Sequence, residues 1–196
     1  MKKLIIAGLS IGILAGCGST DTKNEAKDKP VQNQEVKKEN TTEKKKVVNQ
    51  KDFVAYTKKI KGASFIKEVK LNKNNAEITF YDSFTAYKAA HADSTTTEEQ
   101  YKQYFSTGDT IEKMFVEESS RLLRRFHALN SIKMTLPFEG KTYNINLNRK
   151  DLNKYLGFKV ESLNVTDGSW KSKFVEPYVY DKNKRAEFFK KFVTVQ

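Results

Sequence analysis

The sequence predicts an α+β fold, in which two or more hairpins build an antiparallel sheet with helices packed on one face. Segments of alternating polarity occur in adjacent pairs joined by short turns. Segments with helical periodicity lie between these pairs and after them. Single strands do not alternate with long helices, as they would in a doubly wound parallel sheet.

The first hairpin is predicted from two alternating stretches, residues 65–71 and 76–81. The four residues between them, Asn-Lys-Asn-Asn, favour a turn because asparagine tolerates positive φ. Residues 51–60 precede the hairpin as a predicted helix, with Gly62 as the residue that ends it. One face of this helix should be apolar; it carries Phe53, Tyr56, Thr57 and Ile60.

Three further helices are expected before the second hairpin. Residues 82–92 form the first of them, and Thr97 and Gln100 resemble a capping box that opens a short helix through Phe105. A D-x-x-E pattern at Asp109 starts the principal core helix, which should run to about Leu129. Its acidic residues precede its basic ones, as the helix dipole favours. Its apolar stripe comprises Ile111, Met114, Phe115, Leu122, Phe126 and Leu129.

The second hairpin is predicted at residues 132–136 and 143–147, joined by a turn that contains Gly140. Asn148 and Gly157 should begin and end a short helix. Two more strands are then expected, at residues 158–165 and, broken by Pro177, at residues 170–180. In the last stretch, residues 183–193, the residues expected on one face are Ala186, Phe189 and Val193.

Length and composition indicate one folded domain together with a segment rich in polar residues, which lowers the hydrophobic fraction of the whole chain. The chain has 196 residues, 38% of them hydrophobic and 31% charged, whereas globular domains average roughly 45–50% apolar residues. Its single cysteine, Cys17, excludes an internal disulfide and a thiolate metal site.

In the first seventeen residues, MKKLIIAGLSIGILAGC, Lys2 and Lys3 are followed by an apolar run. The run is too short for the roughly 20 residues of a membrane-spanning helix, so it indicates a signal-peptide core. Its ending, Leu14-Ala15-Gly16-Cys17, resembles the lipobox of bacterial lipoproteins. An ordinary secretory signal with a chance cysteine is the alternative. The preceding octamer, residues 9–16, is similar to peptide pheromones that some Gram-positive lipoprotein signals release.

The lipobox resemblance implies diacylglyceryl and palmitate attachment at Cys17 and a place on the outer side of a cell membrane, in a Gram-positive bacterium. The implied organisation is a signal peptide (1–16), a lipidated cysteine with a disordered tether (17–49), and one α+β domain (50–196). Residues 18–49 contain no aromatic residue and lack the apolar side chains needed to fold. Such a tether spans about 30 Å as a flexible coil.

The basic charge belongs largely to the predicted domain, because residues 50–196 hold 26 Lys and Arg against 18 Asp and Glu. This balance favours anionic partners, namely lipid headgroups, a wall polymer or nucleic acid, and an envelope protein is a further candidate partner. The alternative is a generic lysine-rich surface. A helical spacing of i, i+3 and i+4 places Arg121, Arg124 and Arg125 on one stripe, where they could bind an anion. The alternative is a solvated face with Arg121 paired to Glu117 or Glu118. Nucleic-acid binding is not expected.

The chemistry needed for catalysis is sparse in this sequence. His91 and His127 each fit a helix end, and they lack metal-ligand spacing. The adjacent carboxylates Glu98-Glu99 and Glu117-Glu118 point about 100° apart on a helix. The sequence contains no P-loop and no G-x-G-x-x-G string. We expect no catalytic residue, no metal site and no cofactor.

These observations together favour a lipid-anchored binding or assembly protein of the envelope. The alternatives are a small wall-active hydrolase that uses carboxylates, and an accessory subunit of a conjugation or secretion complex.

Overall fold

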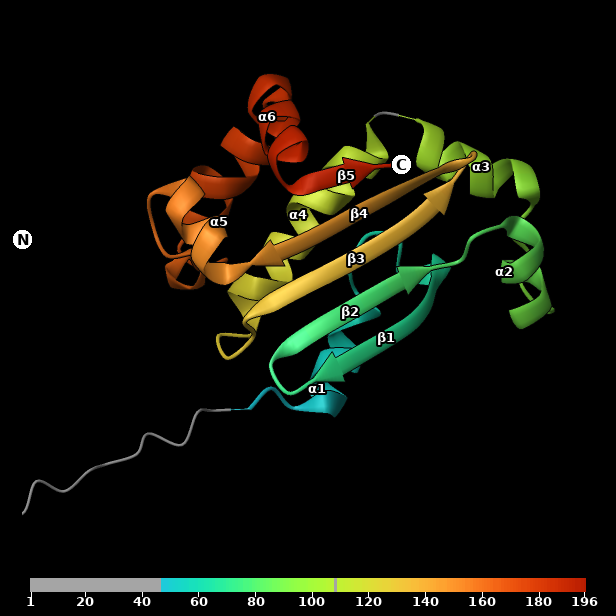
Figure 1. The fold of residues 1–196 in the computed structure, drawn as a ribbon, viewed down its shortest axis with the longest axis horizontal. Coiled ribbons are helices and arrows are strands. Elements are labelled where there is room, and N and C mark those ends of the chain that lie inside the picture. Colours follow the sequence, from blue (N-terminus) through green and yellow to red (C-terminus); the bar gives the residue numbers. More distant parts are fainter. Residues whose placement is uncertain (1–46, 108) are drawn as a thin grey trace, which may run out of the picture. The chain divides into compact units, whose positions relative to one another are not determined.

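A five-stranded sheet forms the centre of the molecule (Figure 1). The computed structural model describes residues 47–107 and 109–196, which belong to one compact unit. The strands lie in the order β1-β2-β3-β4-β5, and all neighbours are antiparallel except the parallel pair β2 and β3. The strands are β1 (Ile66–Asn72), β2 (Asn75–Phe80), β3 (Ser131–Phe138), β4 (Lys141–Asn148) and β5 (Val193–Val195). The predicted α+β fold is confirmed.

Both predicted hairpins are present, each with a two-residue turn. Asn72 pairs with Asn75, and Lys73, not an asparagine, takes the positive φ of 54°. In the second hairpin Glu139 and Gly140 have φ of 49° and 73°. Positive φ at both central residues is the geometry that matches the twist of the flanking strands.

The two hairpins lie side by side because a helical crossover joins β2 to β3. A parallel pair requires such a connection. It contains α2 (Phe84–Ala90), α3 (Glu98–Ser106) and α4 (Thr110–Arg125). The capping box predicted for α3 is present, with reciprocal bonds between Thr97 and Gln100.

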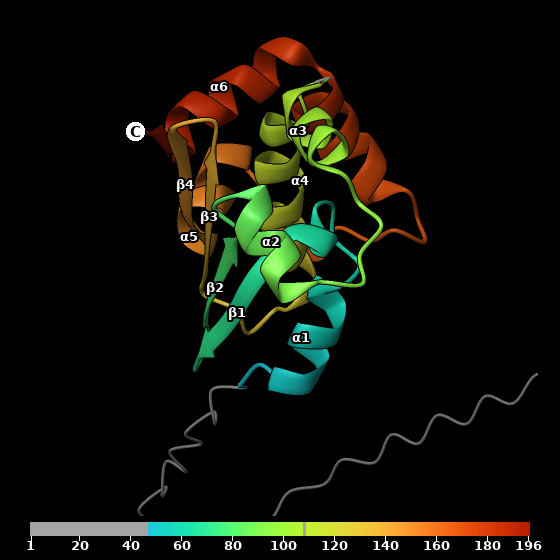
Figure 2. The same cartoon turned by 90° about the vertical axis from the view of Figure 1, so that its right-hand side faces the viewer.

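The helices cover one face of the sheet, as predicted. Figure 2 views the sheet from its edge and shows α1, α3, α4 and α6 on the same side. The covered face holds a row of buried side chains from each central strand: Ala76, Ile78 and Phe80 from β2; Ile132, Met134 and Leu136 from β3; Ile145 and Leu147 from β4. Alternate residues such as Glu77, Lys133 and Asn146 lie on the open face and are exposed. This alternation is the period-2 pattern of a half-buried sheet.

The first helix, α1 (Gln50–Thr57), starts at Asn49, whose side chain accepts a hydrogen bond from the Asp52 amide. It ends before the predicted Ile60, although the predicted inner face is buried at Phe53 and Thr57. Gly62 has the expected left-handed φ of 78°, but it precedes the 3-10 turn η1 (Ala63–Phe65) instead of ending α1. The amide of Val48 donates to Asn74 and its side chain is buried, so the packed domain begins before residue 50.

The core helix α4 begins at the predicted residue, but the contacts at its start differ from the predicted ones. Asp109 has a φ of 56° and its side chain makes no capping bond, so the predicted D-x-x-E cap is wrong. Asp109 and Glu112 both bind Arg185 of the last helix instead. The helix ends at Arg125, four residues earlier than predicted, because Phe126 leaves helical geometry.

The C-terminal third contains two corrections. The helix α5 (Arg149–Leu156) lies between Asn148 and Gly157 as predicted. The expected strand at 158–165 is instead the 3-10 turn η2 (Val160–Ser162), held by local backbone bonds. The expected strand at 170–180 is the π-helix η3 (Lys171–Tyr180), because apolar composition does not distinguish a buried helix from a strand.

The last helix, α6 (Lys182–Phe192), leads into β5. Its buried face carries Arg185 and Phe188, whereas Ala186 of the predicted face is exposed. The predicted signal peptide, Cys17 and the tether to residue 46 lie outside the described residues. The core residues within the described part of the chain run from Val48 to Val193.

Candidate functional site

A groove of about 610 Å³ lies between α1 and the loop that follows α4. We call it the α1 groove. Its volume is within the range of small-molecule sites, roughly 300–1,000 Å³. The described residues that line it are Val47, Val48, Asn49, Asp52, Ala55, Tyr56, Lys59, Arg125, Phe126, His127 and Ala128.

Aromatic packing and one arginine fix the walls of the α1 groove. The rings of Phe53 and Tyr56 meet Phe126 edge to face, with centroids 5.1 and 5.6 Å apart. Arg149 donates hydrogen bonds to the backbone carbonyls of Leu123, Phe126 and Leu129. These carbonyls lie at the C-terminal end of α4, where a cation is favoured by the helix dipole. The loop on one side of the groove is therefore held in a defined conformation.

The charges in the α1 groove favour an anion. Lys59 and Arg125 line it, and neither forms an ion pair with an acidic group of the described residues. Arg125 instead lies over the rings of Tyr56 and Phe126, 5.9 and 5.7 Å from their centroids. Asp52 is the one acid among the described lining residues. The exposed His127 belongs to the same rim.

The three arginines of the predicted anion site have different surroundings. Arg121 binds Glu117, as the solvated-face alternative proposed, and lies 3.4 Å from Glu118. Arg124 stacks on Trp170 at 5.0 Å and faces the Leu163 carbonyl; burial lowers the pKa of this guanidinium. Arg125 is exposed and lines the α1 groove. A single anion site formed by all three stays a prediction, and Arg125 is the member placed at a cavity.

The adjacent carboxylates of α4 are buried in contrasting environments. Glu117 accepts hydrogen bonds from Lys61, at 2.6 Å, and from Arg121. Glu118 is fully buried, and the Arg121 guanidinium lies 3.4 Å from one of its carboxylate oxygens. Burial raises the pKa of Glu118 to about 7, against the opposing effect of Arg121. Neither carboxylate is among the residues that line the groove.

Sequence patterns did not indicate the buried Arg185 or the partly buried Arg149 as residues that hold two elements together. Arg185 is 2% exposed and binds Asp109, Glu112 and the Val179 carbonyl at 2.6, 3.1 and 2.7 Å. One signal was available for Arg185, since it shares a helix face with Phe188 in an aromatic segment. Another was available for Arg149, which lies in the first turn of a helix, where the dipole disfavours a cation.

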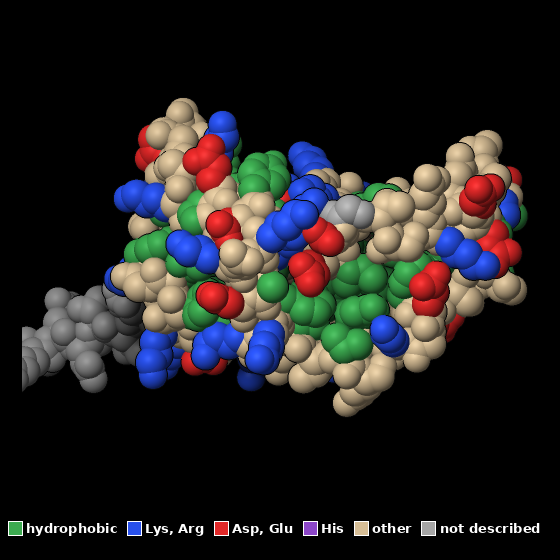
Figure 3. Space-filling view, turned by 90° about the horizontal axis from the view of Figure 1, so that it is seen from above, with side chains coloured by type: hydrophobic (Ala, Val, Ile, Leu, Met, Phe, Trp, Pro, Cys, Tyr) green, Lys and Arg blue, Asp and Glu red, His purple; other side chains and the backbone are tan. Residues whose placement is uncertain are grey.

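The remaining candidates lie outside the α1 groove, and Glu98 and Glu99 line an open hollow of about 530 Å³ on α3. His91 ends α2 and lies 3.4 Å from the hydroxyl of Tyr81, and Glu98 and Glu99 lie on an exposed part of α3. Figure 3 shows a hydrophobic patch on the face seen from above; the edge strand β5 lies on this side and leaves Val195 46% exposed. Within residues 47–107 and 109–196, no group of three or more His, Cys, Asp or Glu side chains is placed to hold a metal ion. None of the helices in these ranges is long and apolar enough to cross a bilayer.

Comparison of the chain with protein-family models, curated proteins and solved structures gives no match. The α1 groove is therefore assigned from its own chemistry. It combines two cations, an aromatic floor and a rigid wall.

Proposed function

We propose that the protein is a lipid-anchored, extracytoplasmic binding protein of the bacterial cell envelope, and that the α1 groove holds its ligand. The observation that carries the proposal is the pair of cations, Lys59 and Arg125, which line a groove without an acidic partner among the described residues. The lipobox-like ending at Cys17 supports attachment to the membrane. The ligand class is an anionic component of the envelope with an apolar part.

The lining of the groove supports binding more than hydrolysis. Glycoside hydrolysis by carboxylates uses two such groups on either side of the scissile bond. Asp52 is the one carboxylate among the described lining residues. Glu117 and Glu118, the adjacent carboxylates considered in the sequence as candidate catalytic groups, lie in the interior of the domain.

The anchor is tested by labelling cells with radioactive palmitate. The native chain should incorporate the label and fractionate with the membrane, because two or more acyl chains give stable attachment. The Cys17→Ser chain should lose the label and leave the membrane fraction. Equal labelling of both chains would contradict lipidation at Cys17.

The ligand class is tested by pull-down on purified cell wall, on teichoic acid and on anionic lipid vesicles, with a salt titration. Binding to at least one of these materials should vanish by a few hundred millimolar salt, because exposed charges are screened. The Lys59→Gln, Arg125→Gln double variant should lose this binding. A matched control removes two exposed lysines of α6, in the Lys182→Gln, Lys190→Gln variant. Wall digestion that disappears on changing one carboxylate would overturn the proposal in favour of a hydrolase.

A further inference from the structure

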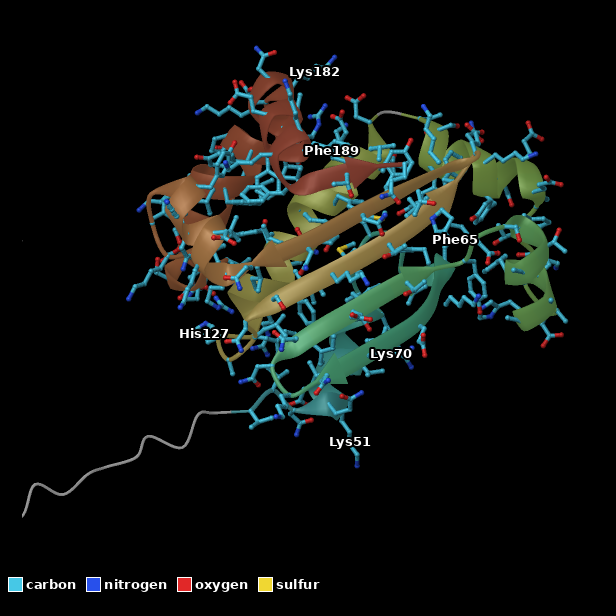
Figure 4. All side chains as sticks on the ribbon, viewed as in Figure 1. Lys51, Phe65, Lys70, His127, Lys182 and Phe189 are labelled. Carbon is cyan, nitrogen blue, oxygen red and sulfur yellow. The ribbon has the colours of Figure 1, made fainter. Side chains whose placement is uncertain are left out.

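The end of the domain that contains the α1 groove is basic. Lys51, Lys58 and Lys59 are exposed on α1 and the turn after it, and Arg125 is exposed across the groove. Figure 4 shows Lys51 at this end of the domain, far from Lys182 on α6. Cations of this kind are attracted to a bilayer that contains anionic lipids, by roughly a fivefold gain in binding for each residue near the surface.

The same end carries the apolar and aromatic groups that an interface with lipid requires. Val47 lines the groove and is 66% exposed. Tyr56 and Phe126 also line the groove, with the Arg125 guanidinium over their rings. Aromatic and basic side chains together are typical of surfaces that lie at the headgroup level of a membrane.

The path of the chain identifies which anion can reach the groove. Val47 lines the groove, and the sequence Lys44-Lys45-Lys46 directly precedes it. Twenty-nine residues, 18–46, separate Cys17 from Val47. A lipid attached at Cys17 would therefore give the groove an effective concentration of membrane surface in the millimolar range. At that effective concentration, a site with weak affinity for a lipid headgroup is sufficient to hold the domain on the membrane.

The geometry points to the α1 groove as a binding site for the phosphate of an anionic phospholipid headgroup, so that the domain docks on the membrane that anchors it. Lys59 and Arg125 bind the phosphate, and Val47, Tyr56 and Phe126 contact the interface beside it. This inference rests on the proposed function, since it takes the envelope ligand to be the anchoring membrane itself. A wall polymer at the same groove is the competing outcome.

The test uses a chain of residues 18–196, which retains every core residue and carries no lipid. It is sedimented with vesicles of phosphatidylglycerol and phosphatidylcholine, and with vesicles of phosphatidylcholine alone. Binding should occur only to the anionic vesicles and should fall steeply with salt. The Lys59→Gln, Arg125→Gln variant should bind about thirty-fold more weakly, from roughly fivefold for each cation.

The control variant, Lys182→Gln with Lys190→Gln, has the same net charge and should bind within about twofold of the parent. Equal losses in both double variants would show that only the net charge matters, and would overturn the inference. Binding of teichoic acid through the groove, without binding of anionic vesicles, would overturn it as well and leave the proposed binding function intact. Absence of palmitate at Cys17 would instead contradict the anchor.

A second measurement does not depend on the folding of a charge variant. The chain from residue 18 contains no cysteine, so a fluorophore sensitive to polarity can be attached at a single position. A label at Ala55→Cys, in the groove, should shift to the blue on adding anionic vesicles. A label at Thr194→Cys, on the exposed edge strand β5, should not. Equal shifts at both positions would contradict docking through the groove.

Discussion

Replacement of Glu118 by glutamine should stabilise the protein above neutral pH. Glu118 is fully buried on α4, where the Arg121 guanidinium lies 3.4 Å from one of its carboxylate oxygens; the effect of burial outweighs that of Arg121. Burial raises its pKa from the ordinary 4.5 to about 7. Glutamine has nearly the same shape as the protonated acid and carries no charge at any pH.

The magnitude follows from linkage between proton binding and folding. Between pH 4.5 and about 7 the folded protein holds a proton on Glu118 that the unfolded chain releases. The free energy of unfolding therefore falls as the pH rises through this window. The full interval corresponds to about 3 kcal/mol, at roughly 1.4 kcal/mol for each pKa unit. The stability of Glu118→Gln relative to the parent should accordingly increase by about 2–3 kcal/mol from pH 5 to pH 8.

The assay is urea unfolding of the parent and variant chains at several pH values, followed by the fluorescence of Trp170. The matched control is Glu117→Gln, which changes the neighbouring carboxylate. Glu117 binds Lys61 and Arg121, so its replacement should destabilise the fold by about 1–3 kcal/mol, the opposite sign. A stability difference between Glu118→Gln and the parent that does not vary between pH 5 and pH 8 would refute the reasoning.

Two further substitutions test the packing around α4. Arg185→Ala should lower the free energy of unfolding by about 2–4 kcal/mol in urea titrations. The substitution empties a buried site and leaves Asp109 and Glu112 without their partner. The control Lys184→Ala, at the exposed neighbouring residue, should change the free energy of unfolding by less than about 0.5 kcal/mol. Gly62→Ala should lower the free energy of unfolding by about 1–3 kcal/mol and lower the melting temperature, since φ is 78° and the added Cβ would lie 2.7 Å from the Met114 sulfur. The control is Gly140→Ala, where φ is also positive but the added Cβ has open space within 4 Å. It separates the effect of backbone conformation from the effect of the clash.

Local sequence patterns predicted the elements whose signals are complete within a few residues. The alternation in the two hairpins gives the observed strands, and the Thr97–Gln100 capping box forms as expected. The same reasoning failed for residues 170–180, where apolar and aromatic residues suggested a strand broken by Pro177. Trp170, Phe174 and Tyr178 instead stack in sequence along a helical face. Their spacing of four residues was a helical signal that the β propensity of the segment obscured.

Contacts between distant residues decided the parts that sequence reasoning missed. The D-x-x-E pattern placed the start of α4 correctly, but its carboxylates bind Arg185, more than seventy residues away. The end of α4 depends in the same way on Arg149 from another helix. The helical periodicity of the sequence continues past Arg125 and therefore predicts a longer helix. In the structure, carbonyl groups at the end of α4 instead accept hydrogen bonds from Arg149, and no local pattern identifies that contact. The α1 groove could not be predicted for this reason, because one of its walls is the loop that Arg149 holds.

The buried carboxylates of α4 should affect the stability of the fold, whereas the exposed cations of the α1 groove should affect ligand binding. Glu117 and Glu118 are buried and are not among the residues that line the α1 groove, whose cations are Lys59 and the last residue of the helix, Arg125. Removal of the buried charge at Glu118 should therefore change the stability of the fold without changing the affinity for an anionic ligand. Replacement of Lys59 and Arg125, which have no acidic partner among the described residues, should change the affinity with little effect on stability. Such independence is expected of a rigid scaffold that presents its ligand site on one exposed end, and it would be absent if the ligand bound through the interior carboxylates.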